Sequence, residues 1–179
     1  MRKENTFRYI LRLAGTLLAI CAVMAGMLAV VNYITKDAIA ANKEAKTQQA
    51  MELILPGVED LAPVALEEDT GLVTAVWRSG DSWAVQTQPG GFGGAITLMV
   101  GIADGKVTGI SVVSHAETPS LGAEAAASSA KGQSFRDQFV GAQEAVVGGN
   151  IDAMSGATIT SKAVAEGVNA ALDYVRAQG

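Results

Sequence analysis

The sequence predicts an α+β protein with one N-terminal transmembrane helix and a domain built on a mainly antiparallel sheet with flanking helices. Three observations lead to this prediction. An uncharged apolar stretch lies near the N-terminus, two pairs of alternating segments meet at short turns, and an amphipathic helix closes the chain. Strands and helices are clustered along the chain and do not alternate, which is typical of the α+β class.

The apolar stretch is long enough for a membrane anchor. Residues 13–31 contain nineteen residues without a charge, and as a helix they span ~28 Å, close to the ~30 Å hydrocarbon core of a bilayer. A cleaved signal peptide is the alternative, because Ala38-Ile39-Ala40 has the small-x-small pattern of a cleavage site. The apolar core is too long and the site too far downstream for that, so we favour the anchor.

Basic residues predict the orientation of this anchor. Four precede it and three follow it: Arg2, Lys3, Arg8 and Arg12, then Lys36, Lys43 and Lys46. By the positive-inside rule the N-terminus lies in the cytoplasm and the domain outside, on a single-pass protein of the cell (inner) membrane. The predicted parts are a cytoplasmic N-terminus (1–12), the anchor (13–34), a helical stalk and connection (35–70) and the domain (71–179).

Composition excludes several functions. The formal net charge is −5 and the pI is about 4.8, so no basic surface is available for a nucleic acid. Cys21 is the single cysteine and His115 the single histidine. An internal disulfide framework, a zinc knuckle and a cysteine-bound cluster are therefore excluded, and we expect no metal site.

Turn chemistry divides the middle of the chain into two hairpins. Residues 71–77 and 82–88 alternate in polarity on either side of Ser79, Gly80 and Asp81. Residues 95–102 and 106–114 form a second pair that turns at Asp104-Gly105. The helix that follows the anchor should end at Pro56-Gly57, and residues 58–70 read as a surface connection.

Helical patterns dominate after the second hairpin. We expect an Ala-rich helix over 122–130, a helical turn over 134–139 and a short buried strand over 144–149. A final helix over 161–176 carries Val164, Val168, Leu172 and Val175 on one face.

The segment before the final helix holds more hydroxyl groups than a helix cap needs. Thr160 or Ser161 can cap the helix by accepting a hydrogen bond from an amide two or three residues further on. Thr158 lies just upstream, where free amides and the positive helix end favour an anion such as a phosphate. A plain hydroxyl-rich cap and a phosphate site both fit this pattern.

The same segment resembles a flavinylation motif. Residues 152–158, DAMSGAT, are similar to the pattern Asp-x-x-Ser-Gly-Ala-Thr, in which the final threonine receives FMN from FAD through a phosphoester bond. The resemblance implies that Thr158 is the attachment site. It also implies that a magnesium-dependent flavin transferase reads Asp152, Ser155, Gly156 and Ala157, the last three of which would also contact the cofactor.

A second segment resembles the same kind of protein. Residues 109–124, GISVVSHAETPSLGAE, are similar to the His-x-Glu-Thr-Pro-Gly-Leu-Gly segment of the RnfG family and of the related NqrC family of the sodium-pumping NADH:quinone reductase. The resemblance implies that four residues lie next to the flavin: Glu117, Thr118, Leu121 and Gly122. Ser120 replaces the family's glycine. If the position needs a positive φ, the serine would be strained; if the glycine instead allows close approach of the flavin, Ser120 would shift the ring or donate a hydrogen bond to it. His115 is either an ordinary strand-end residue or a redox participant.

The resemblance implies an electron-transfer subunit of an Rnf-type complex that couples electron transfer between ferredoxin and NAD⁺ to ion translocation. FMN held covalently through its phosphate supplies the redox chemistry, so the chain needs no complete active site of its own. Its partners would be integral-membrane and iron–sulfur or flavin subunits. Leu121 and an aromatic residue such as Trp77, Trp83 or Phe92 would pack on the ring. A free-standing flavoprotein for extracellular electron transfer and a non-redox binding module are the alternatives.

Overall fold

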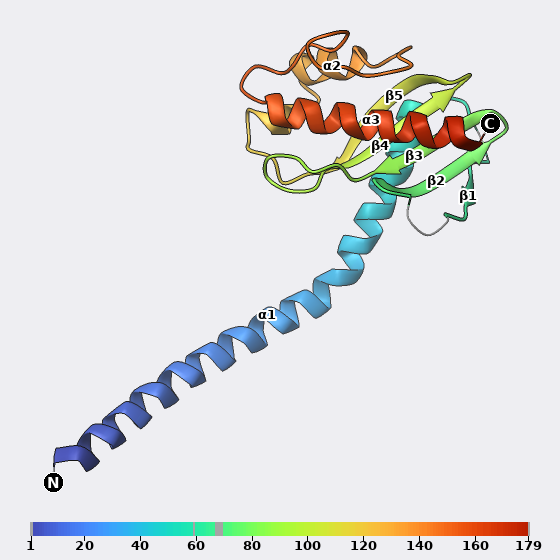
Figure 1. Ribbon diagram of the computed structural model, residues 1–179. Helices are drawn as coiled ribbons and strands as arrows, with labels where there is room; N and C mark the ends of the chain where they lie inside the picture. The colour runs from blue at the N-terminus through green and yellow to red at the C-terminus, as the bar shows by residue number, and fades with distance from the viewer. Residues whose placement is uncertain (1, 59, 67–69, 179) are drawn as a thin grey trace. The chain divides into compact units, whose positions relative to one another are not determined.

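The computed structural model describes residues 2–58, 60–66 and 70–178. The chain divides into two units, Met1–Glu44 and Ala45–Gly179. Helix α1, Arg2–Ile54, supplies the whole described part of the first unit and continues into the second (Figure 1). Within the described residues, α1 is the one helix long and apolar enough to cross a membrane. Its apolar side chains from Tyr9 to Ile34 are exposed to the surroundings, as an anchor requires.

Helix α1 ends where the sequence predicts. The amide of Leu55 still donates to the Met51 carbonyl at 2.9 Å, and Pro56 then stops the helix because it has no N–H to donate. Gly57 follows with a φ of 79°, a conformation that glycine adopts without strain. The prediction that this helix ends at Pro56-Gly57 is confirmed.

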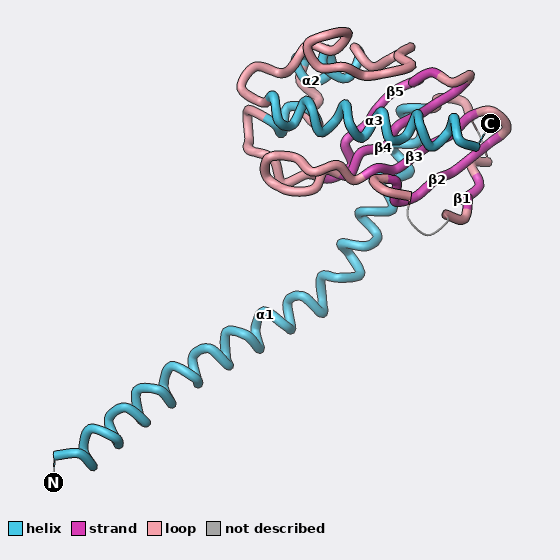
Figure 2. Tube along the Cα trace, viewed as in Figure 1, coloured by secondary structure: helices cyan, strands magenta, loops and turns pink. Residues whose placement is uncertain are grey.

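Five antiparallel strands form one sheet in the order β1-β2-β3-β4-β5 (Figure 2). The strands are β1 (Ala62–Val64), β2 (Val73–Ser79), β3 (Ser82–Thr87), β4 (Thr97–Ala103) and β5 (Lys106–Ser114). Both predicted hairpins are confirmed, and Asp104 and Gly105 turn the second one with φ angles of 52° and 71°. Strand β1 is a correction, because it lies in the predicted connection and pairs with Val76–Arg78 of β2.

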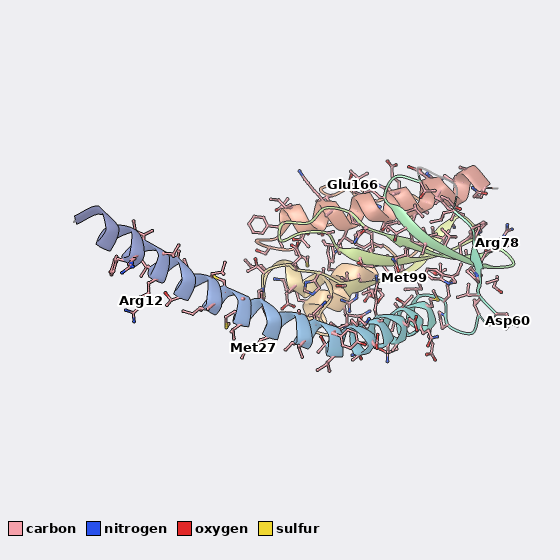
Figure 3. All side chains as sticks on the ribbon, turned by 90° about the horizontal axis from the view of Figure 1, so that it is seen from below. Arg12, Met27, Asp60, Arg78, Met99 and Glu166 are labelled. Carbon is pink, nitrogen blue, oxygen red and sulfur yellow. The ribbon has the colours of Figure 1, made fainter. Side chains whose placement is uncertain are left out.

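Helices cover both faces of this sheet, which explains why strand β4 is buried nearly throughout. Helix α3, Thr158–Gln178, packs Val164, Val168 and Leu172 against one face. On the other face, Ala50 and Ile54 at the end of α1 pack with Met99 of β4. Figure 3 labels Met99 within the sheet, and Glu166 on the exposed side of α3. The end of α1 therefore contributes Ala50 and Ile54 to the domain's core.

Two glycines let the end of α1 approach the sheet closely. Gly101 and Gly109 are register partners in β4 and β5. A Cβ added to Gly101 would lie 2.8 Å from the Ile54 carbonyl oxygen, and one on Gly109 would lie 3.3 Å from the Ile54 Cα. Thr108 then donates its hydroxyl to the same carbonyl at 2.7 Å. The two glycines thus leave space for the last turn of α1, and Thr108 fixes it by a hydrogen bond.

The segment after β5 differs from the predicted helix over 122–130. A short 3₁₀ helix, η1 (Gly122–Ala125), is followed by a break and by helix α2 (Ala130–Asp137). Ser129 causes the restart, because its Oγ accepts from the Gly132 amide at 3.1 Å and donates to Glu124 at 2.6 Å. The sequence pattern places the start of the helix about two turns too early, and α2 contains most of the helical turn expected over 134–139.

The predicted strand over 144–149 is wrong. Only a single bridge forms, between Val147 and Ile151. Asn169 of α3 replaces a strand partner at Ala145, because its side chain accepts from the Ala145 amide at 2.8 Å and donates to the Ala145 carbonyl at 2.9 Å. A side chain therefore satisfies the backbone groups that a neighbouring strand would otherwise bind.

Candidate functional site

A cavity of about 350 Å³ lies where three separate segments meet. The segments are the glycine-rich loop before β4, the loop from the end of β5 into η1, and the start of α3. The cavity is lined by Phe92, Glu117, Thr118, Leu121, Gly122, Gly156, Ala157, Thr158, Ile159 and Thr160. We call it the Thr158 cavity. It brings together the two motifs that stand out in the sequence.

Thr158 is the first residue of helix α3 and its side chain is exposed at the cavity. A turn leads into it, in which Ala157 donates its amide to the Met154 carbonyl at 3.0 Å and Gly156 has a φ of 77°. The first amides of a helix have no intrahelical acceptor, and the helix dipole makes this end positive. The Thr158 hydroxyl is therefore accessible at a place that favours a phosphate group.

The neighbouring hydroxyls have other partners, so the prediction that Thr160 or Ser161 caps the helix is wrong. Helix α3 begins earlier than expected, with the Ser161 amide donating to the Ala157 carbonyl at 2.9 Å. The Ser161 hydroxyl donates to the same carbonyl and accepts from the Met154 amide, both at 3.0 Å. Thr160 donates its hydroxyl to Glu117. Both side chains are buried, whereas that of Thr158 is open to solvent.

Glu117 connects all three segments. The residue is 6% exposed, and its carboxylate accepts from the Gly93 amide at 2.8 Å through Oε1 and from the Thr160 hydroxyl through Oε2. It makes no ion pair among the residues that the structure describes. Hydrogen bonds to a buried carboxylate are strong because one partner is charged. The predicted flavin neighbour Glu117 is thus also the group that holds the cavity walls together.

Glycines leave the space that the Glu117 carboxylate occupies. A Cβ on Gly91 would lie 2.4 Å from Oε1 of Glu117, and a Cβ on Gly122 would lie 2.4 Å from Oε2. Both distances are far below van der Waals contact, so no side chain fits at either position. This explains part of the glycine content of residues 90–94, which the sequence by itself indicates only as a break between strands.

Ser120 adopts a positive φ, one of the two possibilities for this position in the sequence analysis. Its φ is 63°, a region in which residues other than glycine, asparagine and aspartate are uncommon. The turn is closed on both sides, because the amides of Leu121 and Ala123 both donate to the Thr118 carbonyl at 3.2 Å. A glycine at this position would adopt the same backbone conformation without strain.

Three exposed apolar side chains line the Thr158 cavity: Phe92 (69% exposed), Leu121 (42%) and Ile159 (55%). Exposed apolar side chains that converge on a cavity are typical of a binding site. Three aromatic residues were candidates for packing on the flavin ring, and of these only Phe92 lines the Thr158 cavity. Trp83 and Trp77 instead belong to the two hydrophobic clusters on the faces of the sheet. Phe92 lies at the tip of a tight loop in which the Gly91 amide donates to the Gly94 carbonyl at 2.8 Å.

The structure brings together most, but not all, of the predicted site residues. Asp152 and Ser155 are exposed and do not line the cavity; the Asp152 amide donates to the Gln138 side chain at 2.7 Å. Ile159 and Thr160 line the cavity without having been predicted to do so. The sequence could have indicated them, because they directly follow Thr158 and belong to the same first turn of α3.

Among the described residues, no group of three or more histidine, cysteine, aspartate or glutamate side chains is arranged to hold a metal ion. His115 lies two residues before Glu117 of the cavity wall, and its Nδ1 accepts from the Glu117 amide at 3.2 Å. Cys21 is on the exposed surface of α1.

Two family models match the chain, one at each end. Residues 1–54 match the RnfG N-terminal region, and residues 91–173 match the FMN-binding domain. A relative in Clostridium ljungdahlii, the G subunit of a proton-translocating ferredoxin:NAD(+) oxidoreductase complex, is 35% identical over 98% of this chain and 96% of its own length. The chain belongs to the RnfG family.

Other members of the RnfG family are similarly related to this chain over nearly their full length. The G subunit of the ion-translocating oxidoreductase complex of Methanosarcina acetivorans is 33% identical over 91% of this chain and 93% of its own. Its counterpart in the Na(+)-translocating ferredoxin:NAD(+) oxidoreductase complex of Acetobacterium woodii is 32% identical over 91% and 90%. The match to the FMN-binding domain contains the whole Thr158 cavity, from Phe92 to Thr160.

The residues of the Thr158 cavity fit FMN as a ligand. Phe92, Leu121 and Ile159 offer apolar surface for an aromatic ring system, and the α3 N-terminus offers free amides for a phosphate. When bound, FMN supplies the redox chemistry. The Thr158 hydroxyl and the free amides of α3 would lie at the phosphate end of such a ligand, and Glu117 fixes the three wall segments relative to one another.

Proposed function

We propose that this RnfG-family chain is the FMN-carrying electron-transfer subunit of an ion-translocating ferredoxin:NAD⁺ oxidoreductase. The observation that carries the proposal is the position of Thr158: an accessible hydroxyl at the N-terminus of α3, on a cavity with apolar walls. Membership of the RnfG family supports the assignment of this subunit to an Rnf-type complex. Other Rnf subunits are its partners. The chain contributes a redox carrier and no complete active site of its own.

We propose further that FMN is attached covalently to Thr158 by a flavin transferase. In this step the Thr158 oxygen attacks the phosphorus of the FMN half of FAD, and the pyrophosphate bond breaks. AMP leaves, the hydroxyl proton is released, and no electrons are transferred. Asp152 and Ser155 are exposed, so a transferase can read them without unfolding the domain, which supports their role in recognition.

The proposed topology places the N-terminus in the cytoplasm and the domain from Ala45 onward outside. The excess of basic residues before the apolar stretch supports this orientation. Covalent attachment suits an exported domain because it prevents loss of the cofactor. The relatives named above differ in their ion, protons in Clostridium ljungdahlii and sodium in Acetobacterium woodii, so we assign only ion translocation.

Mass spectrometry of the denatured protein tests the attachment. The full chain is purified from its native host, or from cells that carry a flavin transferase, and the peptide containing residues 152–162 is fragmented. We expect the mass of an FMN phosphoester on Thr158. An unmodified peptide from a transferase-competent cell would contradict covalent attachment. A flavin on Ser155 would show that Ser155, and not Thr158, is the attachment residue.

A gentle detergent extraction tests the assignment to a complex. We expect the chain to purify with integral-membrane partners that carry iron–sulfur clusters or flavins. A flavin-loaded chain that purifies alone from its native host would instead favour the free-standing flavoprotein. A protein that remains colourless in the presence of the transferase would favour the non-redox binding module.

A further inference from the structure

We propose that the domain has a second ligand site, a cavity that binds an organic phosphate next to strand β5. Its volume is about 590 Å³, a size typical of sites for small organic molecules. It is lined by Lys46, Gln49, Ala50, Leu53, Ser111, Val112, Val113, Ser114, His115, Ala126, Ser128 and Arg136. We call it the β5 cavity. It shares no lining residue with the Thr158 cavity, so the proposed flavin attachment does not explain it.

The polar side chains of the β5 cavity can all donate hydrogen bonds: Lys46 only donates, and the serine hydroxyls and the Gln49 amide both donate and accept. Lys46 and the hydroxyls of Ser111, Ser114 and Ser128 make no side-chain hydrogen bond or ion pair within the described part of the chain. No aspartate or glutamate is among the lining residues, although the chain as a whole carries a net charge of −5. A positive cavity in an acidic protein indicates an anionic ligand.

Arg136 adds a buried positive charge to the wall. It is 9% exposed, and its guanidinium donates to the carbonyls of Ala125 and Ala127 at 2.7 and 2.9 Å and to the Gln133 side chain at 3.1 Å. Burial lowers the pKa of Arg136, and the nearby Asp137 opposes this shift. Asp137 accepts from Gln133 at 2.7 Å and forms no ion pair with Arg136. The hydrogen-bond partners of the Arg136 guanidinium are therefore all neutral, and an anion in the cavity would complement its charge.

His115 contributes one more donor. Its Nδ1 accepts from the Glu117 amide at 3.2 Å, which assigns the proton of the neutral ring to Nε2. The imidazole thus lines the β5 cavity and at the same time contacts the residue that holds the Thr158 cavity together. This separate task explains the position of the single histidine without a redox role.

The number of donors favours a phosphate over a carboxylate. One ammonium, one imidazole N–H and three hydroxyls line this cavity without protein partners among the described residues, and a carboxylate has only about four acceptor positions. A phosphate offers three strong acceptor oxygens and more charge. Such a group can come from a lipid headgroup, because Lys46 follows the predicted anchor (13–34) by twelve residues, or from a soluble phosphate ester.

The test uses the full-length chain, produced without a flavin transferase so that the result does not depend on FMN. The detergent-solubilised protein is titrated with inorganic phosphate and with glycerol 3-phosphate by isothermal calorimetry. Separately, protein in nanodiscs of phosphatidylcholine, alone or mixed with phosphatidylglycerol, is transferred to native mass spectrometry to detect retained lipid. The variant is Lys46→Glu, and the control is Lys106→Glu, which makes the same charge change at the exposed start of β5.

We expect wild-type protein to bind one of these probes and Lys46→Glu to weaken that binding by about tenfold or more, the change that ~1.4 kcal/mol produces. Lys106→Glu should bind as the wild type does. Retained phosphatidylglycerol that is lost in Lys46→Glu identifies a lipid headgroup, whereas saturable glycerol 3-phosphate binding identifies a soluble ester. No binding by the wild type in either assay, or equal binding by wild type and Lys46→Glu, would overturn the proposal.

Discussion

The Thr158 cavity and the β5 cavity are built around buried charges of opposite sign. Glu117 accepts hydrogen bonds from a glycine-rich loop and from α3, whereas Arg136 donates to carbonyls at the end of η1 and just after it. The two charges do not pair with each other. Glu117 binds a backbone amide and a hydroxyl group, whereas Arg136 binds two carbonyls and the Gln133 side chain. The segment between β5 and α2 is thus held by two buried charges with different partners.

The walls of the two cavities also differ in polarity. Exposed Phe92, Leu121 and Ile159 give the Thr158 cavity apolar surface and one accessible hydroxyl, which suits an aromatic cofactor tethered by its phosphate. The β5 cavity instead offers donors from Lys46 and serine residues. Substitutions in each cavity test whether the two sites act independently.

The largest effect is expected for Thr158→Ala. It removes the proposed acceptor hydroxyl, so covalent flavin should fall from full occupancy to none, while Thr158→Ser should retain some attachment because it keeps a hydroxyl group. Mass spectrometry and in-gel flavin fluorescence measure both. Because Thr158 is exposed, circular dichroism should show an unchanged fold. Covalent flavin that persists in Thr158→Ala would disprove this attachment site.

Glu117→Ala should destabilise the domain by about 3 kcal/mol. It leaves the buried Thr160 hydroxyl and the exposed Gly93 amide without their charged acceptor, and an unsatisfied buried donor or a lost hydrogen bond to a charged group typically costs ~1–3 kcal/mol. Urea unfolding of the full chain in detergent, followed by tryptophan fluorescence, measures the change. The neighbouring Thr118→Ala, at an exposed side chain, should change the free energy of unfolding by only about 0.5 kcal/mol or less. Equal effects of the two substitutions would contradict the role assigned to Glu117.

Arg136→Met should destabilise the domain less, by about 2 kcal/mol. The substitution removes donors from the Ala125 and Ala127 carbonyls but also removes a buried charge whose desolvation is unfavourable, and the two effects partly cancel. The same urea experiment measures it, with exposed Lys131→Met on the same helix as the control. A stabilised Arg136→Met protein would show that the guanidinium is there for a ligand more than for the fold.

The smallest effect is expected for Ser120→Gly. Ser120 has a positive φ of 63°, so glycine should relieve strain and stabilise the chain by about 1 kcal/mol. Ser120→Ala keeps the Cβ and should not stabilise it. Thermal unfolding monitored by circular dichroism compares the two. If Ser120→Gly does not raise the midpoint above that of Ser120→Ala, the serine is retained for its hydroxyl group.

Short-range patterns were sufficient to predict much of this molecule. The uncharged run over 13–31, the turns at Gly80 and Asp104-Gly105 and the stop at Pro56-Gly57 depend on residues close in sequence, and the structure has the corresponding elements in each place. The predicted helix over 122–130 failed because Ser129 caps a new helix within it. Hydroxyl residues compete between capping and distant partners, and periodicity alone does not distinguish these.

By itself, the sequence determined the anchor, both hairpins and the motif that contains Thr158. Only the tertiary structure decided that Thr160 binds Glu117 across 43 positions, that the Gly93 amide binds it across 24, and that donors from α1, β5 and α2 surround a second cavity. The physical reason is that turn chemistry and hydrophobic period act within a few residues. The partner of a buried charge is instead set by how distant segments pack, because burial requires a hydrogen bond but does not say which residue provides it.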